Sequence, residues 1–362
     1  MIEITKQPLA LSLSGGGIRA MMFHMGALRE LANRHMLEQI THISTVSGGS
    51  LLIGLVFHMN NMRWPTSEEY LSIVLPKLKL ALCEKSMQWG ALRQLGKTRN
   101  WRFIFSRANL LAACLVQEWG ITETLSDLPQ SPEWAINGTT AETGKRFRFK
   151  RDNMGDYVFG YSADVADFRL ADAMAVSAAF PIGFGPLALD SSMYRWRKQE
   201  KWQDDGPMVE HTPEYLRLHL YDGGVYDNLG IEPYLDVGTG KKKNSISLNT
   251  RILVLDAGAP LVKKELTSNW HILQLTRLSD IVTDQTRALR VRCLYRFMNE
   301  NQGQANYIYI ANPKLLESGE SKESAKFAVA YPTSLKCPTQ EILEKLVAFG
   351  ECCAVAGLQG NP

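Results

Sequence analysis

The stretch ALSLSGGGIRAMMFHMGAL, residues 10–28, places three glycines between a short apolar run and a segment of helical spacing. Residues 8–14 predict a buried strand, and the apolar residues after the glycines recur with the period of a helix over about 18–35. Glycines at such a junction let backbone N–H groups approach a negatively charged group closely. The stretch therefore predicts a strand, a glycine-rich turn that faces an anion, and a helix.

A second strand, glycine turn and helix follow directly along the chain. ITHISTVS, residues 40–47, is rich in β-branched residues and predicts a strand, and a helix is expected over about 49–60. Strands are expected again at 216–224, 250–258 and 306–313. Two strand–turn–helix units in succession are typical of a wound α/β sheet. We therefore expect an α/β fold, a three-layer α/β/α domain with a mainly parallel central sheet.

The remaining segments are expected to decorate this core within a single domain of residues 1–362. Residues 61–135 have helical spacing and predict a helical insertion or cap. Residues 191–213 are polar and aromatic and predict an exposed loop, a candidate lid. Residues 262–362 are expected to contain helices packed on the core. A chain of 362 residues with 45% hydrophobic content is long enough for one elaborate domain.

Composition and charge exclude several classes of protein. The net charge of +3, from 40 basic and 37 acidic residues, is too small to indicate binding of a nucleic acid polymer. The first residues lack the basic and apolar regions of a signal peptide, and no apolar run is long enough to span a bilayer. The six cysteines show no CxxC pair and no histidine partners at zinc spacing. We expect a cytoplasmic protein with no disulfide framework and no metal site.

STVSGGS, residues 44–50, places Ser47 between a predicted strand and a predicted helix, as a nucleophile elbow requires. The turn is so tight that the residues two before and two after the nucleophile must be small. Gly49 meets this requirement, whereas Thr45 stands where the usual G-x-S-x-G pattern has glycine. Ser47 is a candidate nucleophile, although a serine in such a turn is more often an ordinary turn residue.

The first glycine turn favours a catalytic role for this serine, because acyl transfer to serine creates an oxyanion. Loss of one backbone donor to such an oxyanion typically costs roughly 3–4 kcal/mol. Gly15, Gly16 and Gly17 lie at the start of a predicted helix, whose N-terminus adds a favourable partial charge. Arg19 is expected either to support this loop from behind or to face an anionic substrate.

LYDGGVYDNLG, residues 220–230, supplies a candidate base. Asp222 ends a predicted strand, and the two following glycines let the chain turn tightly and leave the carboxylate free. A carboxylate close to a serine can activate it without a histidine. Alone, an Asp-Gly-Gly sequence is usually a simple turn, but the two preceding motifs favour catalysis. Asp227 is expected to cap the next turn, and Asp256 ends a strand; neither is expected to be catalytic.

Four motifs in this order, LSLSGGGIRA, STVSGGS, AVSAAFPIGFGPL and LYDGGVYDNLG, resemble those of the patatin-like phospholipases and acyl hydrolases. The resemblance covers about residues 8–60, 160–190 and 216–260. It implies a patatin-like fold with a Ser–Asp dyad, a glycine-rich oxyanion loop and no catalytic histidine. It assigns Ser47 as the nucleophile and Asp222 as the base.

The same resemblance implies a reaction and a set of supporting residues. The reaction is hydrolysis of a carboxylic ester of a membrane lipid, of the phospholipase A type, without a metal or organic cofactor. The oxyanion lies against residues 15–17, and residues 177–181 form a packing segment near the dyad. The supporting residues are Arg19, Gly49, Gly223 and Gly224.

Three other classes of protein fit parts of the sequence. The G-x-G-x-x-A pattern at residues 15–20 matches a dinucleotide-binding oxidoreductase, but Ser47 stands at the end of the second strand where an acidic residue is needed. A Ser–His–Asp hydrolase of the α/β-hydrolase class needs a histidine after the acid, and only His271 follows Asp222. A binding module with an inactive site is the third class, and the presence of both dyad residues argues against it.

Residues 85–107 are basic and aromatic, without an acidic side chain. Such a stretch can dock on anionic lipid headgroups, which predicts peripheral contact with the inner face of the membrane. A solvated helix face with its aromatic residues turned to the core is the alternative. The basic residues are Lys85, Arg93, Lys97, Arg99, Arg102 and Arg107.

Overall fold

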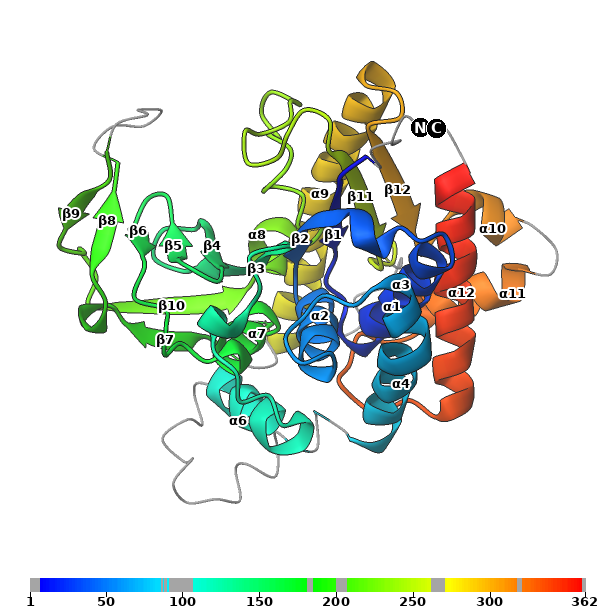
Figure 1. Cartoon of the computed structure of the whole chain (residues 1–362), viewed down its shortest axis with the longest axis horizontal. Coiled ribbons are helices and arrows are strands. Elements are labelled where there is room, and N and C mark those ends of the chain that lie inside the picture. Colours follow the sequence, from blue (N-terminus) through cyan, green and yellow to red (C-terminus); the bar gives the residue numbers. More distant parts are fainter. Residues whose placement is uncertain are drawn as a thin grey trace, which may run out of the picture.

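The protein is built around one mixed β-sheet with helices on both faces (Figure 1). The computed structural model describes residues 7–85, 87, 90, 107–180, 185–199, 207–261, 271–317 and 321–359. Strand and helix alternate over residues 9–59, as in other wound α/β sheets. The expected α/β fold class is confirmed.

The part of the sheet that carries the glycine turns is parallel. Its strands lie in the order β12 (Ala305–Tyr309), β11 (Arg251–Asp256), β1 (Leu9–Leu13), β2 (Ile40–Thr45) and β3 (Glu133–Thr140). All of β1 is buried, because helices cover both faces of a parallel sheet. The carboxyl ends of β1 and β2 are neighbours, with Leu13 opposite Thr45. Both glycine turns therefore meet at one edge of the sheet.

The rest of the sheet is antiparallel and extends from β3. Its strands are β4 (Arg146–Phe149), β5 (Met154–Asp156), β6 (Gly160–Ser162), β7 (Leu187–Asp190), β8 (Trp196–Lys198), β9 (Val209–His211) and β10 (Arg217–Asp222). Among the described strands, four neighbouring pairs are parallel and seven antiparallel, so the expected mainly parallel sheet is wrong for this half. Short turns join β3 to β6 in succession, whereas a parallel connection needs a crossover of about a dozen residues.

Two apolar cores lie on the two faces of the sheet. Leu9, Leu11 and Leu13 point into the larger core, whereas Ala10 points into the smaller one. The smaller core includes α9 (His271–Glu300), which lies close to the short α8 (Gly224–Asp227). The larger core is covered by α1 (Gly17–Asn33), α2 (Gly48–Met59), α4 (Leu75–Glu84), α6 (Arg107–Trp119), α7 (Leu170–Ser177) and α12 (Gln340–Gln359).

The helices α1 and α12 approach each other closely enough to bring their backbones into contact. A Cβ atom on Gly26 would lie 1.9 Å from Val347 O, and one on Gly350 would lie 2.1 Å from Phe23 O. Glycine permits this approach because it has no side chain. The contact between α1 and α12 thus connects the C-terminal part of the chain to the helix that follows the first glycine turn. The same C-terminal part also contains α10 (Pro313–Glu317) and α11 (Ser321–Ala330).

Residues 61–135, expected as a helical insertion or cap, are helical over most of their described part. They hold α3 (Ser67–Glu69), a π-helical turn at Tyr70–Val74, α4 and α6. The last residues of the segment begin β3, so the helical part ends earlier than expected. Most of the basic stretch 85–107 lies outside the described residues, and its contact with a membrane stays a prediction.

Residues 191–213, expected as an exposed loop, contain two strands. β8 pairs with β6 and with β9. Trp196 in β8 is 2% exposed and packs edge-on against Phe159. The loop expectation is therefore wrong for residues 196–198 and 209–211. In β8 the reason is that Trp196 is buried in spite of its polar neighbours. Residues 200–206 lie outside the described part, and the lid role stays a prediction.

Candidate active site

Ser47 stands in a sharp turn between β2 and α2. Its backbone angles are φ 50° and ψ −118°, in a region that residues other than glycine rarely adopt. A Cβ atom on Gly48 would lie 2.3 Å from Gly17 O, and one on Gly49 would lie 2.8 Å from Leu13 O. Gly48 thus lets α2 approach the first glycine turn, and Gly49 lets it approach the end of β1. The backbone thus has the expected form of a nucleophile elbow.

Asp222 ends β10, and its carboxyl lies close enough to the Ser47 hydroxyl for that hydroxyl to lower its pKa. It is 3% exposed, and the Gly224 amide donates to its Oδ1 at 2.6 Å. Burial raises the pKa of the Asp222 carboxyl to about 7, and the hydrogen bond from the Gly224 amide and the nearby Ser47 hydroxyl counteract part of this rise. A carboxyl with this pKa is partly ionised near neutral pH, which suits a general base.

The backbone around Asp222 is held by β3 and by the end of α7. Thr139 Oγ1 donates to the Asp222 carbonyl at 2.9 Å, and Asp222 N donates to Ala179 O at 3.1 Å. A Cβ atom on Gly223 would lie 2.4 Å from Asn137 O. Gly223 therefore supports the site sterically, while Gly224 supports it through its amide. Pro181, at the end of the predicted packing segment, lies outside the described residues.

The first glycine turn lies directly against Ser47. A Cβ atom on Gly15 would lie 3.0 Å from Ser47 Cβ, so glycine leaves room for the Ser47 side chain. The Gly15 amide donates to Asn228 O at 3.1 Å and is not available as the expected oxyanion donor. The Gly16 and Gly17 amides, at the start of α1, donate to no acceptor in the described part of the chain. Of the three amides predicted to bind the oxyanion, those of Gly16 and Gly17 therefore remain as candidate donors.

Arg19 lies behind the glycine turn and is 6% exposed. Its Nη1 atom donates to Tyr331 O at 2.9 Å and to Val329 O at 3.4 Å. Burial lowers its pKa to about 10, so the guanidinium stays charged at neutral pH. Arg19 was expected either to support the glycine turn from behind or to face an anionic substrate, and these contacts fit the first role.

A chain of buried hydroxyl groups runs behind the elbow. Trp134 Nε1 donates to Thr45 Oγ1 at 2.9 Å, and Ser177 Oγ donates to Asn137 O at 2.7 Å. Ser50 Oγ lies between them, 2.7 Å from Thr45 Oγ1 and 2.8 Å from Ser177 Oγ. The indole N–H can only donate and the carbonyl can only accept. Every hydroxyl of the chain must therefore point in the same direction, from the tryptophan to the carbonyl.

This hydroxyl chain fixes Ser47 through its backbone, since Ser47 N donates to Ser177 Oγ at 3.0 Å. Thr45, which departs from the usual glycine of the elbow pattern, is part of that support. Sequence reasoning missed Ser50 and gave Ser177 only a packing role. The contact between Ser47 and Ser177 joins residues 130 positions apart, and no local pattern indicates it.

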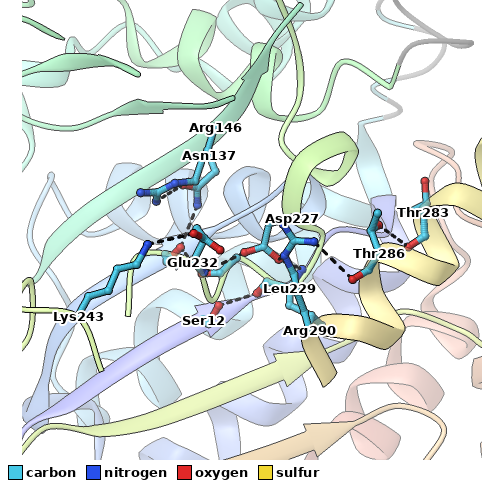
Figure 2. Close-up of polar contacts among 12 residues, drawn as sticks. Ser12, Asn137, Arg146, Asp227, Leu229, Glu232, Lys243, Thr283, Thr286 and Arg290 are labelled. Carbon is cyan, nitrogen blue, oxygen red and sulfur yellow. Dashed lines mark hydrogen bonds and ion pairs between the residues drawn. The ribbon is translucent and has the colours of Figure 1, made fainter. Parts of the chain in front are cut away.

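The loop that follows α8 is held by a buried ion pair (Figure 2). The Asp227 carboxylate accepts hydrogen bonds from the Leu229 and Glu232 amides at 3.0 and 2.9 Å. It also pairs with Arg290 of α9 at 3.1 Å. The expected turn-capping role of Asp227 is confirmed. The ion pair ties α9 to the loop whose Asn228 carbonyl binds the first glycine turn.

Asp256, at the end of β11, is fully buried and has structural partners. Its Oδ1 accepts from the Gly258 amide at 2.7 Å, and its Oδ2 accepts from Arg287 Nε at 2.8 Å and Tyr307 Oη at 2.6 Å. These bonds occupy both carboxylate oxygens. Asp256, which was not expected to be catalytic, therefore holds α9 against the sheet.

None of the described histidine side chains forms a hydrogen bond with Ser47 or Asp222. His24 lies nearby, with Nε2 3.0 Å from Ser14 O, and burial lowers its pKa to about 4. The side chain of His271 lies outside the described residues. Over the described ranges, no three His, Cys, Asp or Glu side chains could hold a metal ion, and the six cysteines form no disulfide.

Comparison with known protein families matches residues 11–235 to Patatin, described as patatin-like phospholipase. The chain therefore belongs to the patatin-like phospholipase family. A search of curated protein sequences finds no match.

Solved structures share this fold at low sequence identity. Human GIVD cytosolic phospholipase A2 is 14% identical, with a TM-score of 0.55 over 98% of this chain and 59% of that chain. Its complex with methyl gamma-linolenyl fluorophosphonate gives a TM-score of 0.51, with 14% identity over 96% and 57% of the two chains. The present chain thus spans about 59% of the length of that phospholipase. The match shows the fold of the chain.

Proposed function

We propose that the protein is a lipid acyl hydrolase of the phospholipase A type, with Ser47 as its nucleophile and Asp222 as its base. The observation that carries this proposal is the buried Asp222 carboxyl beside the hydroxyl of Ser47, which stands in an elbow turn. Membership of the patatin-like phospholipase family supports a lipid ester as substrate. The elbow at Ser47 and the open amides at Gly16 and Gly17 support acyl transfer.

In the first half-reaction, the Asp222 carboxylate accepts the Ser47 proton as the serine oxygen attacks the acyl carbonyl. Negative charge then develops on the former carbonyl oxygen. The Gly16 and Gly17 amides face this charge at the N-terminus of α1, where the helix dipole adds to their effect. Collapse of the intermediate leaves the acyl group on Ser47, and the proton held by Asp222 passes to the departing alcohol.

In the second half-reaction, Asp222 accepts a proton from water, which attacks the acyl-serine ester. The fatty acid leaves as the proton returns from Asp222 to Ser47 Oγ. One carboxyl group thus serves both steps, and its raised pKa allows it to hold the proton between them. No metal or organic cofactor takes part in either step.

The lipid substrate places the protein at a membrane surface. No helix in the described ranges is long and apolar enough to cross a membrane. The basic and aromatic composition of residues 85–107 supports peripheral contact of a cytoplasmic protein with anionic headgroups at the inner face of the membrane.

Labelling with a fluorophosphonate probe tests the dyad, because such probes react with activated serines. We expect the wild-type protein and the His271→Ala variant to be labelled. The Ser47→Ala and Asp222→Ala variants should not be labelled, and both should lose release of fatty acid from phospholipid vesicles. Loss of labelling in a folded His271→Ala protein would instead establish a Ser–His–Asp hydrolase. Circular dichroism confirms that each variant is folded.

A further inference from the structure

The antiparallel strand β4 places two arginines side by side near the candidate active site. Arg146 and Arg148 alternate along β4 with Phe147 and Phe149, which are fully buried in the larger core. Because successive side chains of a strand point to opposite faces, both guanidinium groups lie on the other face of the sheet. Both arginines are half-buried and remain in contact with solvent.

Neither arginine has a carboxylate partner in the described part of the chain. The Arg148 guanidinium lies over the ring of Tyr161, 4.2 Å from its centre, and its Nε is buried without a hydrogen-bond acceptor. Arg146 makes one hydrogen bond, from Nη1 to Asn137 Oδ1 at 3.1 Å (Figure 2). Burial and the positive charge of Arg148 both lower the pKa of Arg146. The positive charges of Arg146 and Arg148 are therefore not balanced by a carboxylate in the described part of the chain.

The carboxylates that act on Arg146 are already neutralised by other side chains (Figure 2). Glu232 pairs with Lys243 at 3.0 Å, and Asp227 pairs with Arg290 at 3.1 Å. Two adjacent guanidinium groups without counter-ions are unfavourable in a half-buried site, since each is partly desolvated and they repel each other. An anionic ligand would relieve this excess of positive charge.

One side chain separates the arginine pair from the elbow of Ser47. Asn137 accepts from Arg146 through Oδ1 and donates through Nδ2 to Thr45 O at 2.9 Å. Its own carbonyl accepts from Ser177, which binds the Ser47 amide. A ligand on the arginine pair would therefore lie next to the strand end that carries the nucleophile.

We infer that Arg146 and Arg148 bind the phosphate of a phosphoester beside the Ser–Asp site, an inference that rests on the proposed function. Guanidinium groups match the oxygens of phosphate with parallel hydrogen bonds, and a neighbouring pair can hold two or more of these oxygens. A glycerophospholipid carries its phosphate a few bonds from the ester that Ser47 would attack. The pair would favour phospholipids over neutral acylglycerols.

The test compares two lipids that differ only in the headgroup, a phosphatidylcholine and a diacylglycerol with the same acyl chains, in the same neutral detergent micelles. For Arg148→Gln, we expect the ratio of kcat/KM for the phosphatidylcholine over that for the diacylglycerol to fall about tenfold or more, because charge-assisted hydrogen bonds are lost. Arg148→Lys keeps the charge but not the planar fork, so its ratio should fall less. It also serves as the test if the glutamine variant does not fold.

A matched control comes from the same antiparallel half of the sheet. Arg197 in β8 already has a counter-ion, Glu210 at 3.1 Å, so Arg197→Gln should keep the wild-type ratio. An equal fall in the Arg148→Gln and Arg197→Gln proteins would overturn the inference. So would a wild-type ratio in both Arg148 variants combined with no phosphate binding.

Calorimetric titration of the Ser47→Ala protein with inorganic phosphate distinguishes a lipid phosphate from a free one. Phosphate binding that Arg148→Gln removes, with an unchanged lipid ratio, supports a site for free phosphate. A lower lipid ratio supports the headgroup site. Failure of the proposed function has a separate signature, since Ser47→Ala would then still release fatty acid from both lipids.

Discussion

Ser47 adopts a backbone conformation that few residues other than glycine tolerate, and the hydroxyl chain from Trp134 to Ser177 holds it there. Thr45→Val removes one hydroxyl with little change in shape, which leaves the Trp134 N–H and Ser50 without their partner. We expect the free energy of unfolding to fall by about 1–3 kcal/mol. We expect kcat to fall roughly tenfold to a hundredfold with little change in KM, because the nucleophile is misplaced.

Two variants of the same strand control this experiment. Thr45→Ser keeps the hydroxyl and should restore most of the lost kcat, which a merely steric role of Thr45 would not explain. Thr41→Val removes the half-buried hydroxyl of Thr41, which lies 3.3 Å from Leu9 O and away from the elbow, and should leave kcat unchanged. Steady-state kinetics and urea unfolding of the three proteins supply both measurements.

The raised pKa of Asp222 links activity to stability. An aspartate in the unfolded chain has a pKa near 3.9, whereas the Asp222 pKa in the folded protein is about 7. Between these values the folded protein holds a proton that the unfolded chain has lost. The free energy of unfolding therefore falls as the pH rises through this window, by up to about 1.4 kcal/mol per pH unit. Asp222→Asn should remove this loss and make the protein more stable than wild type at pH 8.

The same carboxyl sets the pH dependence of the reaction, because only its ionised form accepts the Ser47 proton. Wild-type kcat/KM should rise with pH through about 7. Hydrolysis by Asp222→Asn should be lower by roughly a thousandfold or more. Urea unfolding of both proteins at pH 4.5 and pH 8 gives the stability difference. A difference that does not change with pH would show that the Asp222 pKa is ordinary.

At the scale of secondary-structure elements, the contact between α1 and α12 connects the C-terminal helix to the helix that follows the first glycine turn. A methyl group at Gly350 would lie 2.1 Å from Phe23 O, so Gly350→Ala must push the two helices apart. We expect the free energy of unfolding to fall by about 1–3 kcal/mol. Gly54→Ala in α2 is the control, because its methyl group meets the flexible end of Met174.

Urea unfolding compares the two alanine variants. The loss in Gly350→Ala should exceed the loss in Gly54→Ala, since a backbone carbonyl cannot turn aside as a methionine side chain can. Equal losses would show that α12 shifts freely against α1. In that case the contact would not support the first glycine turn.

The elements that the sequence predicted are those with a local signature. The strand at 8–14, the helix near 18–35 and the strand at 40–47 correspond to β1, α1 and β2 with ends that differ by a few residues. The strand β3 was missed, because Asn and Gly interrupt the one aromatic and three β-branched residues of EWAINGTT and leave no clear run. Its place in the sheet depends on pairing with β2, β4 and β10, which lie far apart along the chain.

For the whole molecule, the ordered motifs around Ser47 and Asp222 were enough to predict the fold class and the family. Motifs of this kind are visible because glycine is required wherever two backbones nearly touch, as at Gly49 and Gly223. The antiparallel direction of the strands from β4 onwards was not predictable from the sequence. It depends on which edge of β3 is left unpaired for the strands that follow. The hydrogen bond that the Gly15 amide donates to Asn228 O was not predictable either, because it joins segments that lie far apart along the chain.

The contacts behind the first glycine turn have a consequence for a chain that is still being made. The Ile18 amide donates to Ser334 O at 2.8 Å, Arg19 donates to Tyr331 O, and Gly26 lies against Val347. All of these partners leave the ribosome after both dyad residues have been synthesised. A nascent chain that already displays Ser47 and Asp222 therefore lacks the contacts that support its first glycine turn. We expect such a chain to stay inactive until α12 has been made and has packed against α1.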